Sequence, residues 1–310
     1  MVYDLVGIGN PVYDTIVTPW IKTDGRVLSG CSTNACLVAK KLGLDNVGLV
    51  GSTGPDFAER FLLEMKTFGI GTTPTSMKKQ SGGFHLIYDD RGDRTLDVLG
   101  VGDRIEPKDI PSEYLDARSI IIGPVLGEVD LELVQFIRDR SKAILFLDPQ
   151  GLVRIIGENR RVLHVCDKDE FRQIAELVDF LKPNEHESET ITRERDPFRA
   201  IHEMRDMSRA VPIVTLAERG SILIKDSRLY RIPPFPTKAI DSTGAGDVYA
   251  GAFVANFLNQ RDVVEAAMFA SAAASIMVEQ VGPEFKISAE AVELRKKEIR
   301  RALSAEAVSQ

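Results

Sequence analysis

The residues best suited to chemistry lie in one short stretch, which reads Asp241-Ser242-Thr243-Gly244-Ala245-Gly246-Asp247. Its small residues let backbone N–H groups approach an anion without obstruction by side chains. The apolar-rich segment that follows, Val248 to Leu258, predicts a helix whose N-terminus adds unpaired donors and a positive dipole end. The stretch therefore predicts a phosphate site, with Asp247 placed to take a proton from a hydroxyl that attacks the phosphate. The structural alternative is a tight strand-to-helix turn in which Asp247 only complements the dipole.

These seven residues resemble the C-terminal signature of the ribokinase (PfkB-type) carbohydrate kinases. The resemblance implies that Asp247 is the general base. It also implies that Gly244, Ala245 and Gly246 form the anion hole that holds the transferring phosphoryl group. Asp241 and Thr243 stand where many members bind a monovalent cation such as K⁺.

The acceptor side of the expected site lies near the N-terminus. Asp14 closes the segment Gly9-Asn10-Pro11-Val12-Tyr13-Asp14, where the resemblance implies a carboxylate that binds substrate hydroxyls; a turn cap is the alternative. The run Ser29-Gly30-Cys31-Ser32-Thr33-Asn34 is similar to the family's first signature, with Ser29 in place of the usual first glycine. It implies that Gly30 lets the backbone approach the sugar and that Asn34 binds hydroxyls. A simple helix cap at Ser32 or Thr33 is the alternative.

The nucleotide side is expected after two later strands. Lys182-Pro183-Asn184-Glu185-His186-Glu187 resembles the family's Pro-Asn-x-x-Glu, which implies that Asn184 and Glu187 organise the phosphates and a water-bridged Mg²⁺. An acidic helix N-terminus is the alternative. Thr215 and Gly220 belong to a turn similar to Thr-x-Gly-x-x-Gly, with Ala217 in place of a glycine, and are expected at the phosphates and ribose.

Further site residues are expected in three places. The adenine is expected beside the Ala-rich helix, near Ala273 and Gly282. Asp148-Pro149-Gln150-Gly151 with Arg154 resembles an archaeal subgroup that contains inositol-type kinases, which implies that Asp148, Gln150 and Arg154 together face the acceptor or the γ-phosphate; a surface arginine is the alternative. His85 is a further expected acceptor ligand.

The elements that must position these residues alternate along the chain. The β-type runs lie at 5–8, 47–50, 119–122, 144–147, 180–181, 213–216 and 222–224, and several are apolar on both faces. The helical patterns lie at 33–42, 57–68, 130–140, 169–178 and 197–209, with an amphipathic helix from Ser288 onward. The alternation predicts a doubly wound α/β layer, and the resemblance implies a three-layer α/β/α fold with a mostly parallel central sheet.

A small β-sheet is expected apart from the main one. Residues 83–99 alternate around Asp90-Arg91-Gly92-Asp93 and predict a β-hairpin, with residues 13–27 as its partner. In the resembled family such strands form a lid over the sugar site and often a dimer contact, which implies a homodimer through the lid. A surface hairpin without function is the alternative. The whole chain, 1–310, is expected to be one domain with this lid inserted.

Composition excludes several classes of protein. The chain has 310 residues, a net charge of -7 and no long block of basic residues, so a nucleic-acid partner is not expected. Cys31, Cys36 and Cys166 form no metal-binding spacing and predict reduced thiols in a cytoplasm. No signal peptide is expected, and the longest apolar run, 266–278, is too short for a membrane span.

The resemblance implies a kinase that moves the γ-phosphate of ATP to a hydroxyl, with Mg²⁺ and with K⁺ as a further cofactor. No cluster of Arg and Lys awaits a phosphorylated substrate, so the expected acceptor is an uncharged sugar, polyol or cyclitol. A nucleoside kinase of the same family would use the same residues, and a non-catalytic sugar sensor would share the fold.

Overall fold

Short runs rich in Ile, Leu and Val form the main sheet of the computed structural model, which describes residues 2–19, 22–75, 80–88, 94–280 and 285–308. Its strands are Leu5–Ile8 (β1), Val47–Ser52 (β4), Gly71–Thr75 (β5), Ser119–Ile122 (β8), Ile144–Leu147 (β9), Phe180–Leu181 (β12), Val211–Thr215 (β13), Ser221–Lys225 (β14) and Arg228–Ile232 (β15). They form a nine-stranded sheet in the order β15-β14-β13-β12-β9-β8-β1-β4-β5. The strands from β13 to β5 are parallel, whereas β14 and β15 continue the sheet in antiparallel pairings.

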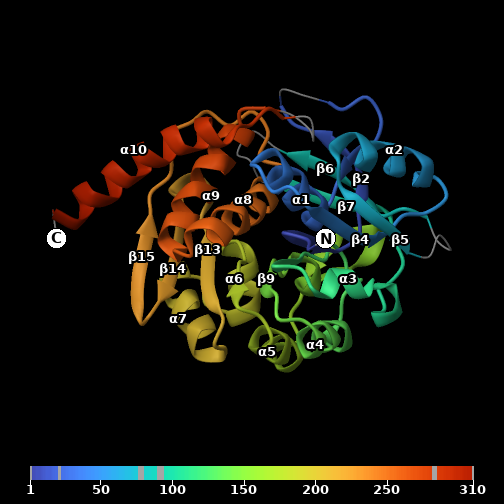
Figure 1. Ribbon diagram of the computed structural model, residues 1–310, viewed down its shortest axis with the longest axis horizontal. Helices are drawn as coiled ribbons and strands as arrows, with labels where there is room; N and C mark the ends of the chain where they lie inside the picture. The colour runs from blue at the N-terminus through green and yellow to red at the C-terminus, as the bar shows by residue number, and fades with distance from the viewer. Residues whose placement is uncertain (1, 20–21, 76–79, 89–93, 281–284, 309–310) are drawn as a thin grey trace.

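Helices cover both faces of this sheet and bury its alternating side chains in two cores (Figure 1). One face is covered by Cys31–Lys41 (α1), Ala58–Phe68 (α2), Ala245–Gln260 (α8), Val263–Met277 (α9) and Ala289–Val308 (α10). The other is covered by Ser112–Leu115 (α3), Leu131–Arg140 (α4), Lys168–Glu176 (α5), Glu185–Thr192 (α6) and Pro197–Met207 (α7). Neighbouring residues Leu5 and Val6 of β1 face opposite cores, as the pleat requires. The expected three-layer α/β/α architecture is therefore confirmed.

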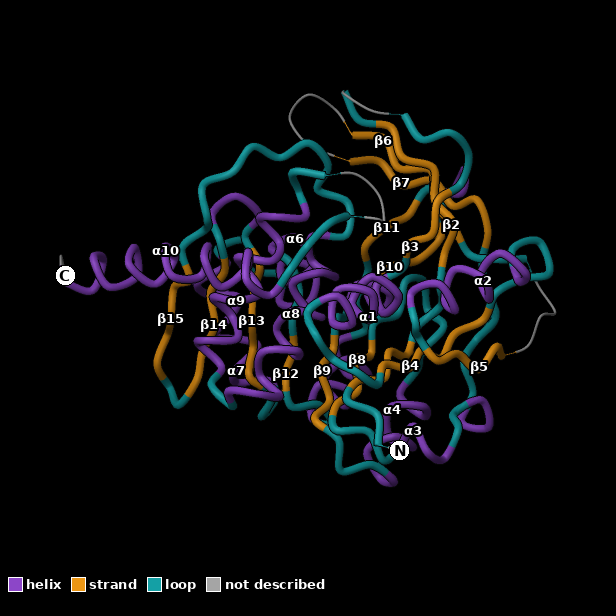
Figure 2. The backbone as a smooth tube through the Cα atoms, turned by 45° about the horizontal axis from the view of Figure 1, so that its top comes forward, coloured by secondary structure: helices purple, strands orange, loops and turns teal. Residues whose placement is uncertain are grey.

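A second, smaller sheet stands beside the carboxyl ends of the main strands (Figure 2). It consists of Val12–Val17 (β2), Val27–Ser29 (β3), Gly83–Tyr88 (β6) and Arg94–Gly100 (β7), in the order β3-β2-β6-β7. We call this the small sheet. Phe84 and Leu96 bury its inner face in a third core that also contains Val125 and Val162 from outside the small sheet.

The element boundaries agree with the sequence expectations within about two residues for most elements. Helix α1 begins at Cys31, two residues before the expected start. The turn Asp90–Asp93 that the sequence predicts within residues 83–99 falls outside the described residues. One hairpin was not expected at all: Arg154–Ile156 (β10) pairs with Val162–His164 (β11) and lies against β7. Its strands have three residues each, too few to show a period in the sequence.

In the part of the chain that the structure describes, no helix combines the length and the apolar character that crossing a membrane would require.

Candidate active site

The site lies at the carboxyl ends of the central parallel strands, the usual place for ligands in open α/β sheets. Asp148 directly follows β9 and Lys182 directly follows β12. The backbone ladder continues past both strands, because Asp148 N bonds Ile122 O at 2.9 Å and Lys182 N bonds Leu147 O at 2.9 Å. The two side chains are therefore held by the rigid centre of the sheet.

Helix α8 delivers Asp247 to this edge. Gly244 is its N-cap, with φ 80° in the left-handed region, and Ala245 is its first residue. A Cβ on Gly244 would lie 3.0 Å from Asn34 Nδ2, so both the backbone angle and the close approach require glycine. The Gly244–Gly246 amides thus stand at a helix N-terminus, as the sequence predicts for an anion site.

Asp247 is bound by residues from two distant segments. Asn34 Nδ2, from α1, donates to Asp247 Oδ2 at 2.9 Å. Gln150 Nε2, from a 3₁₀ turn after β9, donates to Asp247 Oδ1 at 3.3 Å. The Cys31 thiol donates a further hydrogen bond to Asp247. The structure therefore brings together three residues that the sequence assigned to one site, Asp247, Asn34 and Gln150, and adds Cys31.

A buried ion pair lies beside this carboxylate. Lys182 Nζ and Asp148 Oδ2 are 2.7 Å apart, and each side chain is 3% exposed. Ligand atoms of Cys31, Asp148 and Asp247 all lie within 4.8 Å of one another. A Cβ on Gly246 would lie 3.1 Å from Lys182 Nζ, so the ammonium also touches the start of α8.

These charges set the protonation states of the site. Burial raises the pKa of Asp247, and the nearby Asp148 raises it further, while Asn34 and Lys182 oppose the shift. Burial by itself would lower the pKa of Lys182, but Asp148 and Glu187 outweigh it and the pKa is raised. Burial raises the pKa of Cys31 well above its usual value, with Asp148 adding to it, so the thiol stays protonated. Asp247 is thus a carboxylate of increased basicity, with a permanent cation close by.

The residues expected to bind the acceptor lie where β2 meets β6. Asp14, 3% exposed on β2, accepts a hydrogen bond from Phe84 N at 2.7 Å. Burial raises the pKa of Asp14 to about 6, against the hydrogen bonds from Phe84 and from the Ser29 hydroxyl. A buried carboxylate with few fixed donors can accept hydrogen bonds from the hydroxyls of a ligand.

Gly30 explains why Ser29 can replace the family's glycine. Gly30 itself adopts φ 118°, whereas Ser29 has no positive φ and ends β3. A Cβ on Gly30 would lie 2.8 Å from Asn10 O, so this position has no room for a side chain. Ser29 instead contributes its hydroxyl to Asp14.

Arg154 is buried near Asp14 and Glu187, with 6% of its surface exposed. Its Nη1 donates to Val125 O at 3.3 Å, and its guanidinium lies 6.0 Å from the centre of the Phe84 ring. Its charge lowers the pKa of both Asp14 and Glu187. Arg154 is therefore a buried cation of the cleft and not a surface arginine.

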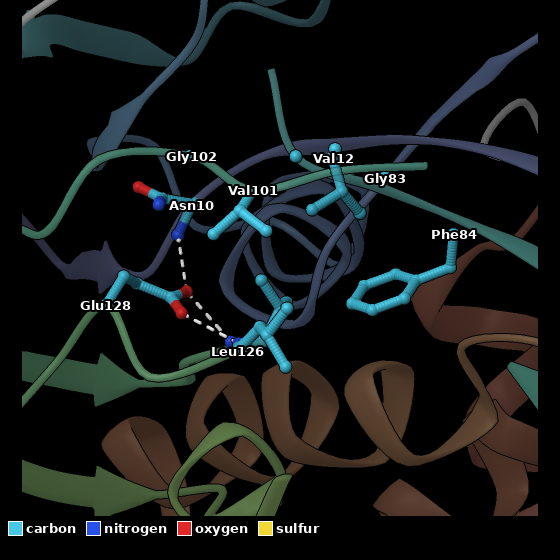
Figure 3. A pocket seen from close by; sticks show the side chains of 11 residues that line it. Asn10, Val12, Gly83, Phe84, Val101, Gly102, Leu126 and Glu128 are labelled. Atoms are coloured by element: carbon cyan, nitrogen blue, oxygen red, sulfur yellow. Dashed lines mark hydrogen bonds between the residues drawn. The ribbon is translucent and has the colours of Figure 1, made fainter. Parts of the chain in front are cut away.

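A small pocket with mostly apolar walls lies under the small sheet next to Phe84 (Figure 3). Its walls include Val12, Val101 and Leu126, and the buried carboxylate of Glu128 forms part of the lining. Glu128 accepts from Asn10 N at 3.0 Å and from Leu126 N at 2.8 Å. This carboxylate therefore holds the loops around the pocket together.

On the nucleotide side, Asn184 and Glu187 form a reciprocal cap at the start of α6. Asn184 Oδ1 accepts from Glu187 N at 2.8 Å, and Glu187 Oε2 accepts from Asn184 N at 2.9 Å. This is the helix start that the sequence offered as the structural alternative. Glu187 also belongs to the buried charge cluster, because burial and Asp148 raise its pKa. Glu187 thus caps α6 and also belongs to the charge cluster of the site.

Thr215 lies next to this cap, because Thr215 N bonds Pro183 O at 3.2 Å and its backbone bridges to Asn184. Gly220 has φ 85°, and a Cβ there would lie 2.1 Å from Ile232 O, so its glycine is explained by the turn itself. Ala217 adopts φ 51° where the family pattern has glycine.

Asp241 and Thr243 form the loop before α8. Asp241 Oδ1 accepts from Thr243 N at 2.9 Å, whereas its Oδ2 is buried without a hydrogen-bond partner among the described residues. Thr243 Oγ1 donates to Tyr88 OH of the small sheet at 2.9 Å. A buried oxygen without a donor fits a bound cation.

Three expected site residues are not brought to the cleft. His85 lies on the opposite face of β6 from Phe84 and Tyr88, where its Nδ1 contacts Thr15 Oγ1 at 2.6 Å. Ala273 has 0% exposure within the α9 core and offers no surface to an adenine. Gly282 lies outside the described residues.

Comparison with known proteins agrees with this geometry. The sequence profile of the pfkB family carbohydrate kinases matches residues 21–290. The chain belongs to this family. Its relatives include the cytidine kinase of Thermococcus kodakarensis, 27% identical over 84% of this chain and 91% of that protein. The nucleoside kinase of Methanothermobacter thermautotrophicus is 27% identical over 92% of each chain, and the inositol 3-kinase of Arabidopsis thaliana is 27% identical over 90% of this chain and 75% of that protein.

Solved structures of this carbohydrate kinase family share the fold. A pyrophosphate-dependent kinase of the ribokinase family, complexed with a pyrophosphate analog and myo-inositol, has a TM-score of 0.79 at 20% identity, covering 94% of this chain and 99% of its own. The ribokinase of Thermotoga maritima has a TM-score of 0.75 at 22% identity, covering 96% of this chain and all of its own. By its family and its named relatives the chain is a carbohydrate kinase.

Sequence reasoning missed three residues around the kinase site: Ser29, Cys31 and Lys182. Each stands inside a motif that the sequence analysis quoted, so their positions were in view. Their partners, however, are set by strand order and by the approach of α8 to α1, which local sequence does not reveal.

Proposed function

We propose that this kinase transfers the γ-phosphoryl group of ATP to a hydroxyl of a small uncharged sugar, polyol or cyclitol. In this proposal Asp247 is the general base, and the Gly244–Gly246 amides hold the phosphoryl group. Asp14 and Asn34 bind the acceptor, and Arg154 completes its side of the cleft. The observation that carries the proposal is the convergence on Asp247, at the start of α8, of Asn34 from α1 and Gln150 from the turn after β9.

The protonation states support the roles. The pKa of Asp247 is raised by burial and then by Asp148, which increases its affinity for a proton. The acceptor hydroxyl gives its proton to this carboxylate as its oxygen attacks phosphorus. The bond from phosphorus to the bridging oxygen breaks, and the nucleoside diphosphate leaves with the electron pair. Amides at a helix N-terminus stabilise the charge that spreads over the phosphoryl oxygens.

The residues present fit the cations that such a reaction needs. Family members use a nucleotide with a divalent metal, and the acidic Glu187 beside Asn184 is suited to a hydrated Mg²⁺. When bound, the metal would neutralise phosphate charge. Asp241 Oδ2, buried without a donor, fits a monovalent cation such as K⁺ beside the anion hole.

A nucleoside acceptor is the second candidate. The pocket beside Phe84, with Val12, Val101 and Leu126 in its walls, supplies apolar surface next to the carboxylate of Asp14 (Figure 3). The pocket itself has a volume of about 10 Å³, room for a water molecule only, so its walls would have to move apart to receive a base. Two relatives named as nucleoside-type kinases add weight to this candidate.

The base assignment is tested with Asp247→Asn. Asparagine keeps the size of the side chain but has little affinity for a proton, so kcat should fall by about 10² to 10⁴-fold while nucleotide affinity stays within a factor of about three. Steady-state kinetics and calorimetric nucleotide binding measure the two effects. Turnover within about tenfold of the parent enzyme would refute the role of Asp247.

The acceptor is identified by a screen of sugars, inositols and nucleosides with ATP, ADP and pyrophosphate as donors. The Asp247→Asn variant is the blank for contaminating kinases. We expect the highest kcat/KM with an uncharged cyclitol or sugar. A preference for nucleosides would favour the second candidate, and binding without any transfer across the screen would contradict both.

A further inference from the structure

The cluster formed by Lys182 and Asp148 has no role in the proposed chemistry so far. We propose that Lys182 is a further catalytic residue, a buried cation that stabilises the phosphoryl group during transfer, and that Asp148 is the positioning residue that holds it. This inference rests on the proposed function, because it takes the Gly244–Gly246 amides as the place of the phosphoryl group.

The position of the ammonium carries the first step of the argument. A Cβ on Gly246 would lie 3.1 Å from Lys182 Nζ, which places the ammonium against the second residue of α8. The amides at this helix start are the donors of the anion site. An oxygen of a phosphoryl group bound there would thus lie close to a full positive charge. In a site that excludes water, this charge would stabilise the phosphoryl group more than the amides alone can.

The burial of the pair carries the second step. Lys182 and Asp148 are each 3% exposed, and their 2.7 Å contact satisfies one of the three N–H donors of the ammonium. Replacement of a buried ion pair by apolar groups is often neutral or stabilising, so stability alone is a weak reason for its presence. The pair stands at the carboxyl ends of β9 and β12, where this fold places its chemistry.

Charge balance carries the third step. Three carboxylates gather here, those of Asp148, Glu187 and Asp247, and among the described residues the cations that act on them most strongly are Lys182 and Arg154. Arg154 lies toward Phe84 and Asp14 on the acceptor side. Among the described residues of this cluster, Lys182 is thus the cation that reaches the start of α8.

The reaction balances with Lys182 as a constant cation. The acceptor oxygen forms its bond to phosphorus, its proton passes to Asp247, and the bond to the leaving diphosphate breaks. Lys182 keeps its proton throughout, because Asp148 and Glu187 raise its pKa against the effect of burial. Lys182 stabilises the phosphoryl group electrostatically, and this stabilisation increases as negative charge accumulates on the phosphoryl oxygens during transfer.

The test compares Lys182→Met, Asp148→Asn and the double variant, which replaces the pair by two neutral side chains of similar size. Lys296→Met is the matched control, because Lys296 of the outer helix α10 is also a buried lysine, 5% exposed, and pairs with Glu293 of α10 and Glu265 of α9. We expect the double variant to lose about 10²-fold in kcat, with KM for the acceptor changed less than about threefold. We expect Lys296→Met to keep its kcat.

Affinity for a transition-state mimic separates catalysis from folding. The double variant should lose about tenfold or more of its affinity for ADP with aluminium fluoride and magnesium, while ATP affinity changes little. Equal losses for both ligands, or unchanged kcat, would overturn the proposal.

The pH profile supplies a readout that a structural role would not move. Groups from several elements face Asp247: Cys31 and Asn34 from α1, Gln150 from the 3₁₀ turn, and Asp148 and Lys182 after β9 and β12. Loss of the Lys182 charge should move the acidic limb of kcat/KM to higher pH, and loss of the Asp148 charge should move it to lower pH. If the double variant fails to fold, the pH profile of Asp148→Asn alone decides the test. An acidic limb that does not move, or moves to higher pH, would then overturn the proposal.

The failure of this inference can be told from the failure of the proposed function. An inactive Asp247→Asn variant beside fully active Lys182 variants would refute this inference only, whereas an active Asp247→Asn variant would refute the proposed function.

Discussion

At the residue scale, Asp14 combines a proposed role in acceptor binding with a cost in stability. Burial raises its pKa to about 6, although Phe84 N and the Ser29 hydroxyl donate to it. Its folded pKa therefore exceeds the ordinary value of 3.8, and the native state holds the proton more tightly than the unfolded chain. The free energy of unfolding accordingly decreases as pH rises from about 4 to about 6 and stays reduced above that range.

Asp14→Asn should therefore stabilise the fold at pH 7.5, by up to about 3 kcal/mol, and this gain should vanish near pH 4. The same change should raise KM for the acceptor about 10- to 100-fold, because charge-assisted hydrogen bonds to its hydroxyls are lost. Urea unfolding at several pH values and steady-state kinetics measure both effects. A variant that is less stable at pH 7.5 than at pH 4, relative to the parent, would contradict the assigned burial cost.

At the scale of elements, the contact between α1 and α8 fixes the distance between Asn34 and Asp247. A Cβ on Gly251 of α8 would lie 2.2 Å from Ala35 O and 2.5 Å from Val38 Cγ1. The two helices are therefore as close as a glycine allows. Ala35 is the neighbour of Asn34, so the spacing of the helices is transmitted directly to the hydrogen bond with Asp247.

Gly251→Ala should push α1 and α8 apart. The clash should outweigh the gain in helix propensity of about 1 kcal/mol and destabilise the protein by about 1–3 kcal/mol. It should also lower kcat severalfold or more, because the 2.9 Å bond from Asn34 to Asp247 is stretched. Denaturant unfolding and kinetics measure the two quantities.

Gln260→Ala is the control for propensity, since Gln260 is exposed at the end of the same helix. It should leave kcat unchanged. A Gly251→Ala variant as active and as stable as this control would show that the helices can separate without consequence for the site.

Local sequence patterns predicted the elements well because their causes are local. The glycines before Asp247 and the apolar segment after it indicate a turn and a helix without reference to the rest of the chain. The pairing of Lys182 with Asp148 has no such signal, because it depends on β12 lying beside β9. His85 was misplaced for a related reason: strand alternation predicts two faces but not which one meets the cleft.

At the scale of the whole molecule, a hydrogen bond joins the small sheet to the loop before α8. Thr243 Oγ1 donates to Tyr88 OH at 2.9 Å, which joins β6 to the loop before α8. The sequence expected the small sheet to act as a lid over the acceptor. This contact gives such a lid a direct connection to the residues that hold phosphate.

Tyr88→Phe should remove this connection and leave the aromatic ring in its core. The loss of one hydrogen bond, about 1 kcal/mol, should raise acceptor KM about fivefold and increase the share of ATP lost to water. The ratio of diphosphate to phosphorylated acceptor measures that share. Tyr230→Phe, on the outer strand β15, is the matched control, and identical ratios in both variants would argue against a latch at Tyr88.

The carboxylates proposed to bind the acceptor and to act as the base lie on different parts of the molecule. Asp14 belongs to β2 and is bonded to β6, both in the small sheet, whereas Asp247 belongs to a helix seated on the main sheet. Substitutions in β2, β6 and β7 should thus change the acceptor specificity and leave Asp247 and its neighbours on the main sheet unchanged. Divergence toward new substrates within such a scaffold needs changes in only a few exchangeable strands, and engineering of this chain for another alcohol should begin there.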